Sequence, residues 1–178
     1  VDPKAPLVRG DFEDGTEKTE WGYQFKFYRS WLTAYERVAR ETGGKCMHLT
    51  YGKEKNNTAA GAVAPGVWEI DKYPIIRFAY RIPKGVPVAL CVEPFESVSG
   101  PRGWILGGTE SRNKGQYVEV EPLVLQDDGE WHEATVDVRK LKAAAPDLKY
   151  LRRFMFLCYW KEDKGQEFWF DDFSIAPK

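Results

Sequence analysis

The sequence has few of the residues that most often carry catalysis or covalent cross-links. Among its 178 residues are two histidines and three cysteines. It contains no Gly-x-Ser-x-Gly elbow, no His-Glu-x-x-His pair and no phosphate-binding loop, and its cysteines lack the spacing of a zinc site. His48 and His132 therefore have little support as metal ligands or as members of a catalytic triad. The sequence gives little support for an enzyme.

The chain also lacks a strong net charge and a long apolar run. The net charge is −1, so no strong field attracts nucleic acid or an acidic membrane surface. No run of about 18 apolar residues is present, so no membrane-spanning helix is predicted. The first residues, Val1-Asp2-Pro3-Lys4, show no signal-peptide pattern and are typical of a trimmed start or of a linker within a larger protein.

Each of the three cysteines lies in an apolar, strand-like run. We therefore expect Cys46, Cys91 and Cys158 to be buried free thiols. One disulfide with one odd thiol is the alternative, and the sequence does not show which residues would pair.

Aromatic residues are abundant, which favours a β-rich fold. Ile75–Ile82 alternates apolar and polar residues, Pro83-Lys84-Gly85 forms a turn, and Val88–Glu93 alternates again, so we predict a β-hairpin. The side chains expected to face the core are Ile76, Phe78, Tyr80, Ile82, Val88, Leu90 and Val92. Those expected on the other face include Arg77, Arg81 and Glu93.

Other strand-like segments are spaced closely along the chain, at Leu7–Glu13, Trp21–Phe27, Lys45–Tyr51, Trp104–Gly107, Tyr117–Leu125, Trp131–Val138, Arg153–Trp160 and Phe168–Ile175. Ser30–Arg40 fits a helix or a strand, and its strand-like neighbours favour the strand. Gly52–Gly66 is predicted to be a loop, and Leu141–Ala145 one helical turn that ends before Pro146. No alternation of strands with helices occurs, so we predict one antiparallel β-sandwich over residues 1–178.

The last strand contains two adjacent carboxylates. Phe168 and Phe170 share one parity, whereas Phe173 and Ile175 share the other, which predicts a β-bulge at Asp171-Asp172. Carboxylates inside an aromatic strand need cations, donors or a metal. The acidic stretch Gly10–Gly15 could supply the second half of such a site, so we expect the first and last strands to lie side by side and share a calcium ion.

Four motifs in this order resemble the galactose-binding-like jelly-roll domains, which include many carbohydrate-binding modules of bacterial polysaccharide-degrading enzymes. The motifs are Gly10-Asp11-Phe12-Glu13, Gly44-Lys45-Cys46-Met47-His48-Leu49, Gly129-Glu130-Trp131-His132-Glu133 and Trp169-Phe170-Asp171-Asp172-Phe173. The resemblance spans nearly the whole chain and indicates a single jelly-roll β-sandwich, but it does not single out one module family. The segment around Tyr35 and the residues 52–66 depart from the pattern.

The resemblance implies a structural calcium between the first and last strands. Mapped by motif, Glu13 and Asp171 would supply side-chain oxygens, and Asp11 with Gly44 or Lys45 would supply backbone carbonyls. Such a mixture of oxygen ligands suits Ca²⁺. The alternative is that Glu13 and Asp171 pair with Lys45 or with an arginine.

Sugar binding needs exposed aromatic rings and side chains that bond hydroxyl groups. Arg77, Arg81 and Glu93 could form a row that reads hydroxyls or uronates, or they could be a solvated charged face. Candidate stacking residues are Trp104, Tyr117, Tyr159 and Trp160, with Trp68 and Tyr73 at loop positions, although each could instead lie in the core. Trp131 and Trp169 are assigned to the core.

We therefore predict non-catalytic binding of a polysaccharide or oligosaccharide. The chain would be a module of a secreted bacterial enzyme, in cis with its catalytic domain, and would act outside the cell, in the periplasm or at the cell surface. Two alternatives stay open, because one fold can carry many functions. One is a structural or protein-interaction domain, and the other is a jelly-roll polysaccharide lyase or glycoside hydrolase.

Overall fold

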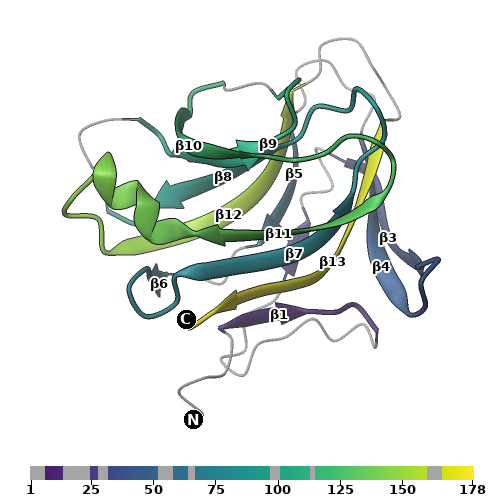
Figure 1. Cartoon of the computed structure of the whole chain (residues 1–178), viewed down its shortest axis with the longest axis horizontal. Helices are drawn as coiled ribbons and strands as arrows, with labels where there is room; N and C mark the ends of the chain where they lie inside the picture. The colour runs from purple at the N-terminus through teal and green to yellow at the C-terminus, as the bar shows by residue number, and fades with distance from the viewer. Residues whose placement is uncertain are drawn as a thin grey trace.

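Two β-sheets packed face to face make up the protein (Figure 1). The computed structural model describes residues 7–13, 25–27, 32–51, 58–63, 67–96, 101–112, 115–159 and 166–178. The first sheet has the order β11-β7-β13-β4-β3, and β1 pairs with the far half of β13. Its strands are β1 (Val8–Gly10), β3 (Leu32–Ala39), β4 (Lys45–Tyr51), β7 (Ile75–Arg81), β11 (Trp131–Asp137) and β13 (Glu167–Ala176).

The second sheet has the order β10-β9-β8-β12-β5-β2, and β6 pairs with β12. Its strands are β2 (Phe25–Phe27), β5 (Thr58–Val63), β6 (Trp68–Glu69), β8 (Ala89–Pro94), β9 (Trp104–Gly108), β10 (Val118–Val124) and β12 (Tyr150–Tyr159). The predicted all-β sandwich is confirmed. One pair departs from the antiparallel pattern, because β10 runs parallel to β9.

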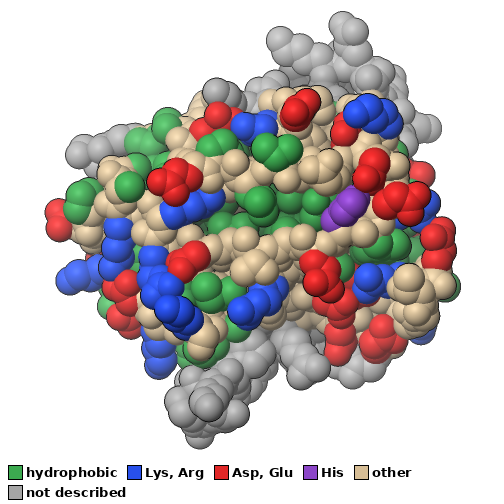
Figure 2. Space-filling model, viewed as in Figure 1, with side chains coloured by type: hydrophobic (Ala, Val, Ile, Leu, Met, Phe, Trp, Pro, Cys, Tyr) green, Lys and Arg blue, Asp and Glu red, His purple; other side chains and the backbone are tan. Residues whose placement is uncertain are grey.

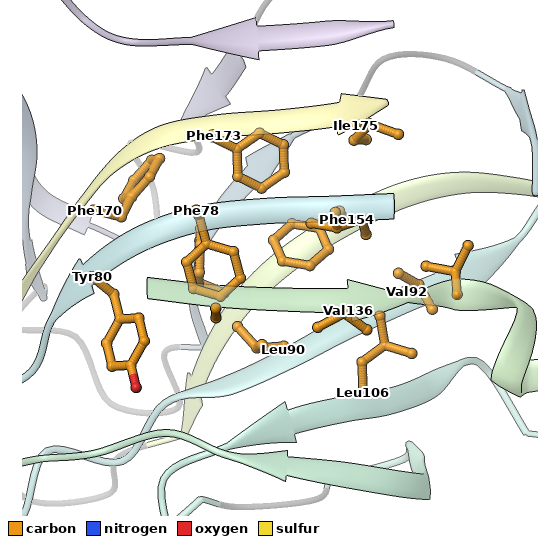
Figure 3. Packing of buried hydrophobic residues seen from close by; sticks show 14 of the residues in the cluster. Phe78, Tyr80, Leu90, Val92, Leu106, Val136, Phe154, Phe170, Phe173 and Ile175 are labelled. Carbon is orange, nitrogen blue, oxygen red and sulfur yellow. The ribbon is translucent and has the colours of Figure 1, made fainter. Parts of the chain in front are cut away.

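Phenylalanine rings fill the space between the sheets (Figure 3). Phe78 of the first sheet meets Phe156 of the second edge to face, with centroids 5.4 Å apart, and Phe154 lies 5.2 Å from Phe173. Both β7 and β8 direct the predicted alternate residues into this core. Burial of these rings is the main source of stability, since apolar area removed from water contributes about 25 cal/mol per Å².

The predicted bulge in β13 is present. The pairing register with β7 shifts between Asp171 and Ser174, and Asp172 has a positive φ of 47°. The extra residue changes the parity of the strand, so that Phe170 before it and Phe173 after it are both fully buried.

The predicted hairpin of β7 and β8 is wrong. β7 pairs with β11 and β13 in the first sheet, whereas β8 pairs with β9 and β12 in the second. The connection at residues 82–88 crosses between the sheets. Alternation shows which side chains face the core, but two strands that face one core from opposite sheets show the same alternation as two that pair.

The other segments divide between confirmed and corrected expectations. Ser30–Arg40 contains a strand, β3, as favoured. The predicted loop at residues 52–66 contains a strand, β5, which pairs with β12. The predicted helical turn is a 3₁₀ helix, η1 (Val138–Ala143), which Asp137 caps by accepting a bond from the Arg139 N–H. Within the described residues, no helix has the length and apolar character needed to cross a membrane.

Candidate functional site

The predicted ligand row is not assembled, because its members lie on opposite outer faces of the sandwich. Arg77 and Arg81 lie on the outer face of the first sheet and Glu93 on that of the second. Arg81 donates to the carbonyl of Gly129 at 2.7 Å and to Glu41 at 2.9 Å. Arg81 therefore holds neighbouring segments of the first sheet together, and Arg77 is exposed beside it on the same strand.

The predicted stacking residues are mostly buried. Trp68 and Trp104 are each 2% exposed and belong to the core, and Tyr73 is buried there too. Tyr117 is buried but lies on the outer face of the second sheet, where it contacts Glu93. The side chain of Tyr159, like all of Trp160, lies outside the described residues.

Trp131 and Trp169 are not in the core, which corrects their assignment. Both are partly exposed on the outer face of the first sheet, on strands that flank Arg81. Trp169 stacks on His48 with centroids 4.6 Å apart, and the Arg40 guanidinium lies 4.2 Å from the centre of the Trp131 ring. The reason is parity, since Phe168 and Phe170 point inward and Trp169 between them must point outward.

The predicted calcium ligands have other partners. Asp171 accepts a bond from Arg40 Nη1 at 2.8 Å on one oxygen and from the Asp172 N–H at 2.8 Å on the other. Glu13 Oε1 accepts a bond from the Lys45 N–H at 2.9 Å and lies against Gly44, where an added Cβ would be 2.3 Å from it. Asp11 Oδ1 lies 3.4 Å from the N–H of Glu13.

As arranged, the two carboxylates predicted to bind calcium are engaged by other donors, Asp171 by Arg40 and Glu13 by the Lys45 N–H. Among the residues that the structure describes, no three acidic, histidine or cysteine side chains gather closely enough to hold a metal. The arginine pairing weighed as the alternative is present at Asp171. Burial nevertheless raises the pKa of Asp171 to about 6, because desolvation outweighs the bonds from the Asp172 N–H and Arg40. Calcium stays a prediction.

The most unusual polar arrangement lies on the outer face of the second sheet, around Glu93. This carboxylate is fully buried, and we call it and its partners the Glu93 cluster (Glu93, Arg102, Tyr117, Arg152 and Arg153). Oε1 accepts bonds from the Tyr117 hydroxyl at 2.8 Å and Arg102 Nε at 3.3 Å. Oε2 accepts a bond from Arg152 Nη2 at 3.0 Å and lies 3.6 Å from Arg153 Nη1.

Two local features of the chain build this cluster. The register of β12 against β8 shifts between Leu151 and Arg153, so the adjacent residues Arg152 and Arg153 both reach Glu93. Gly103 leaves room for the Tyr117 ring, because a Cβ at this position would lie 2.8 Å from a ring carbon.

The cluster keeps Glu93 ionised. Burial alone would raise its pKa, but the Tyr117 hydroxyl and the charges of Arg153 and Arg152 together hold the pKa below its usual value. Burial and the bond to Glu93 raise the pKa of Tyr117, so this side chain stays a neutral donor. Three guanidinium groups surround this one carboxylate.

Two exposed aromatic residues lie beside the cluster. Phe95 directly follows β8, two residues after Glu93, and its N–H donates to the carbonyl of Tyr150 at 3.1 Å, so these two residues lie opposite each other. Phe95 is 52% exposed and Tyr150 37% exposed. In the middle of the outer face of the second sheet, the apolar side chains, which include Cys91 and Met155, are buried. The part of this face that a ligand can reach is therefore the end near Glu93.

A shallow hollow of about 370 Å³ lies at the edge of the sandwich. Pro101 and Val118, which are chain neighbours of Arg102 and Tyr117, line it. Trp104 and the segment Ala144–Leu148 complete its lining.

The face seen in Figure 2 carries a strip of hydrophobic side chains between charged ones, on the side of the molecule where β10 and β11 lie in front.

The sandwich is curved, so the outer faces of its two sheets differ in shape. Figure 1 shows β7, β12 and β13 curving in the same direction, with the second sheet on the inner side of the curve. The Glu93 cluster therefore lies on the inward-curving side, and Arg77 and Arg81 lie on the other.

Sequence reasoning missed Arg102, Arg152, Arg153, Phe95 and Tyr150. The available signal was the charged pair Arg152-Arg153 next to an apolar run, which breaks the alternation of a half-buried strand. Glu93 and Tyr117 were identified, but with the wrong neighbours.

No model of a protein family matches the sequence, and no curated protein matches it. Solved structures do match the fold. The family 11 carbohydrate-binding module of the cellulosomal cellulase Lic26A-Cel5E from Clostridium thermocellum has 12% identity and a TM-score of 0.54, covering 82% of this chain and 81% of that one. A family 28 module described as specific for non-crystalline cellulose has 14% identity and a TM-score of 0.52, covering 100% and 95%.

A tandem of family 22 modules from Paenibacillus barcinonensis Xyn10C has 16% identity and a TM-score of 0.52, and the match covers 98% of this chain and 49% of that one. The structure thus matches β-sandwich modules of several carbohydrate-binding families from bacterial glycan-degrading enzymes. At these identities the match shows a shared fold alone.

Proposed function

We propose that this chain is a non-catalytic module that binds a polysaccharide at the end of the second sheet, around the Glu93 cluster. The fold is that of modules described as carbohydrate-binding, which supports the proposal without specifying a glycan. The observation that carries the proposal is the pair of exposed rings, Phe95 and Tyr150, beside arginines held by a buried carboxylate.

This arrangement meets the physical needs of sugar recognition. The C–H face of a pyranose ring packs against an aromatic ring, and its hydroxyl groups accept bonds from guanidinium N–H groups. Phe95 and Tyr150 offer exposed rings, and Arg102 and Arg152 offer donors. The site is open, so we expect weak affinity, since an open site excludes little water and buries little area.

The surroundings of Glu93 support binding rather than hydrolysis. A glycosidase needs two carboxyl groups that face the scissile bond from either side. Both oxygens of Glu93 already accept bonds, and the other buried carboxylate among the described residues, Asp171, lies on the first sheet. A lyase or hydrolase is therefore the weaker alternative.

Affinity electrophoresis tests the proposal. Native gels containing cellulose derivatives, xylan, mixed-linked glucan or pectin should retard the protein in at least one case. Phe95→Ala and Tyr150→Ala should each weaken that retardation by about tenfold in dissociation constant, the effect of losing about 1.4 kcal/mol of stacking. Val124→Ala is the control, because Val124 is 48% exposed on β10.

Two results would contradict the proposal. If no polysaccharide retards the protein, the alternative of a structural or protein-interaction domain gains. If a polysaccharide does so equally with Phe95→Ala, Tyr150→Ala and Val124→Ala, the site lies elsewhere.

As a module, the chain would act in cis with a catalytic domain in an exported bacterial enzyme. The family 11 and family 30 modules that it matches come from cellulosomal cellulases of Clostridium thermocellum, and this part of the proposal extends their setting to the present chain.

A further inference from the structure

We infer that the bound polysaccharide carries carboxylate or sulfate groups, and that Arg102 and Arg152 bind them. The inference rests on the proposed function and specifies its ligand class. Its starting point is the charge of the Glu93 cluster, in which one carboxylate meets three guanidinium groups. The guanidinium groups of Arg102 and Arg152 are about half exposed and share the single charge of Glu93, so positive charge remains for an anionic ligand.

The two arginines keep donors available for a ligand. Arg102 uses Nε to reach Glu93, and within the described residues its two terminal nitrogens have no partner. Arg152 uses Nη2. Their side chains are 58% and 49% exposed, whereas Glu93 beneath them is fully buried. A ligand approaching this end of the sheet therefore meets guanidinium groups and not the carboxylate.

Glu93 acts as an internal anchor that orders both arginines in advance. A guanidinium group held on one edge loses less conformational freedom when its other edge binds a ligand. Arginine presents a planar fork of donors that matches the two oxygens of a carboxylate or of a sulfate, which suits it to this role more than lysine. The buried Tyr117 also donates to Glu93, so the anchor does not depend on the ligand.

The spacing fits one charged sugar. Phe95 follows Glu93 by two residues, directly after the end of β8, and two residues of extended chain span about 7 Å. A pyranose ring on Phe95 or Tyr150 could thus place an attached anionic group at the nearby arginines. The aromatic rings would bind the sugar ring and the arginines its charge.

Matched pairs of polysaccharides test the ligand class, using affinity gels with the whole chain. Carboxymethyl cellulose and cellulose sulfate each share the backbone of neutral hydroxyethyl cellulose, and pectate shares that of methyl-esterified pectin. The protein should bind the anionic member of at least one pair about tenfold more tightly, and high salt should reduce the difference. The carboxylated and sulfated pairs distinguish the two anions.

A double variant tests the residues. Arg102→Gln with Arg152→Gln should remove the preference for the anionic member, whereas Arg37→Gln with Arg77→Gln, which removes the same charge from exposed positions of the first sheet, should keep it. Arg152→Lys should retain part of the preference, because it keeps the charge and loses the fork. Thermal melting of each variant checks that it is folded.

The outcomes separate the two proposals. Equal retardation by charged and neutral members overturns the anionic ligand and leaves polysaccharide binding intact. A preference that the Arg37 and Arg77 variant loses as fully as the Arg102 and Arg152 variant also overturns it, because net charge would then be the cause. Retardation by no polysaccharide overturns both.

Discussion

Two carboxylates, Glu93 and Asp171, are buried among the described residues, and their surroundings shift their pKa values in opposite directions. Tyr117 and two arginines hold the pKa of Glu93 below its usual value in spite of burial, whereas burial raises the pKa of Asp171 to about 6. Glu93 therefore stabilises the folded protein in its ionised form, and Asp171 destabilises it when it ionises.

The raised pKa of Asp171 predicts how stability depends on pH. An unfolded aspartate has a pKa of about 3.9, so the folded state binds the extra proton between about pH 4 and about pH 6. The stabilisation that protonated Asp171 gives the folded state is complete below that window and is lost as the pH rises through it. The free energy of unfolding of Asp171→Asn minus that of the parent should therefore rise by at most about 3 kcal/mol between about pH 4 and about pH 7.

Urea unfolding of the parent and of Asp171→Asn, at about pH 4 and about pH 7, measures this difference in the free energy of unfolding. Asp172→Asn is the matched control, because Asp172 also bonds Arg40 but is 60% exposed. Parallel stability profiles for the parent and Asp171→Asn would show that Asp171 titrates as an ordinary carboxyl group.

At the scale of elements, the hairpin of β3 and β4 brings Arg40 to the bulge of β13. Arg40 bonds Asp171 and Asp172 and lies over Trp131 on the edge strand β11. A calcium ion between the first and last strands would have to take Asp171 from Arg40. The two cations would therefore compete for one carboxylate.

This competition predicts a difference between the parent and Arg40→Ala. If the predicted calcium binds, millimolar calcium should raise the melting temperature of Arg40→Ala by several degrees more than that of the parent, because a ligand of the folded state stabilises it by mass action. Magnesium, which demands a stricter octahedral geometry, should have less effect. A double variant of Arg40→Ala with Asp171→Asn should not respond. If calcium changes the melting temperature of neither the parent nor Arg40→Ala, the calcium prediction is wrong.

The single strands and the pairing of the first strand with the last were predictable, whereas the partners of β7 and β8 were not. The bulge at Asp171-Asp172 could be predicted because aromatic residues reverse parity there, and the inward residues of β7 and β8 followed from alternation. The sheet in which each strand lies depends on contacts between distant segments, which periodicity does not encode. That error placed Arg77 beside Glu93 and concealed the true neighbours of Glu93, which come from β12 and from the residues before β9.

At the scale of the whole molecule, the sandwich buries Cys46 and Cys91 as free thiols. Cys46 and Cys91 are unpaired and at most 1% exposed, as predicted. Burial raises the pKa of Cys46 to about 11 and also raises that of Cys91, so thiolate is rare near neutral pH. The side chain of Cys158 lies outside the described residues.

Thiol labelling therefore reports global unfolding. A thiol reagent should react slowly with the native protein and rapidly with all three cysteines in denaturant, since the thiolate is the reacting form. The measurement is the number of labels per chain by mass spectrometry, without reductant. One label per unfolded chain would reveal a disulfide between the other two cysteines.

The β-sandwich class was predictable from the spacing of strands and turns, and the position of the site was not. The Glu93 cluster needs the end of β8, the bulge in β12 and the segments before β9 and β10 to meet. None of its five members is conspicuous alone, because an arginine or a tyrosine in a strand is usually solvated or part of the core. The function proposed for them depends on all five lying together.

The pairing of β1 with β13 has a mechanical consequence. These strands are antiparallel, with Val8 opposite Ile175, and the Leu7 N–H donates to the Ile175 carbonyl at 2.7 Å. The described chain therefore starts and finishes at the same corner of the first sheet (Figure 1). Tension applied at Leu7 and Ala176 would load the hydrogen bonds between β1 and β13 one after another from this corner. β1 would therefore unzip from β13 at a lower force than if all of these bonds were loaded together in shear.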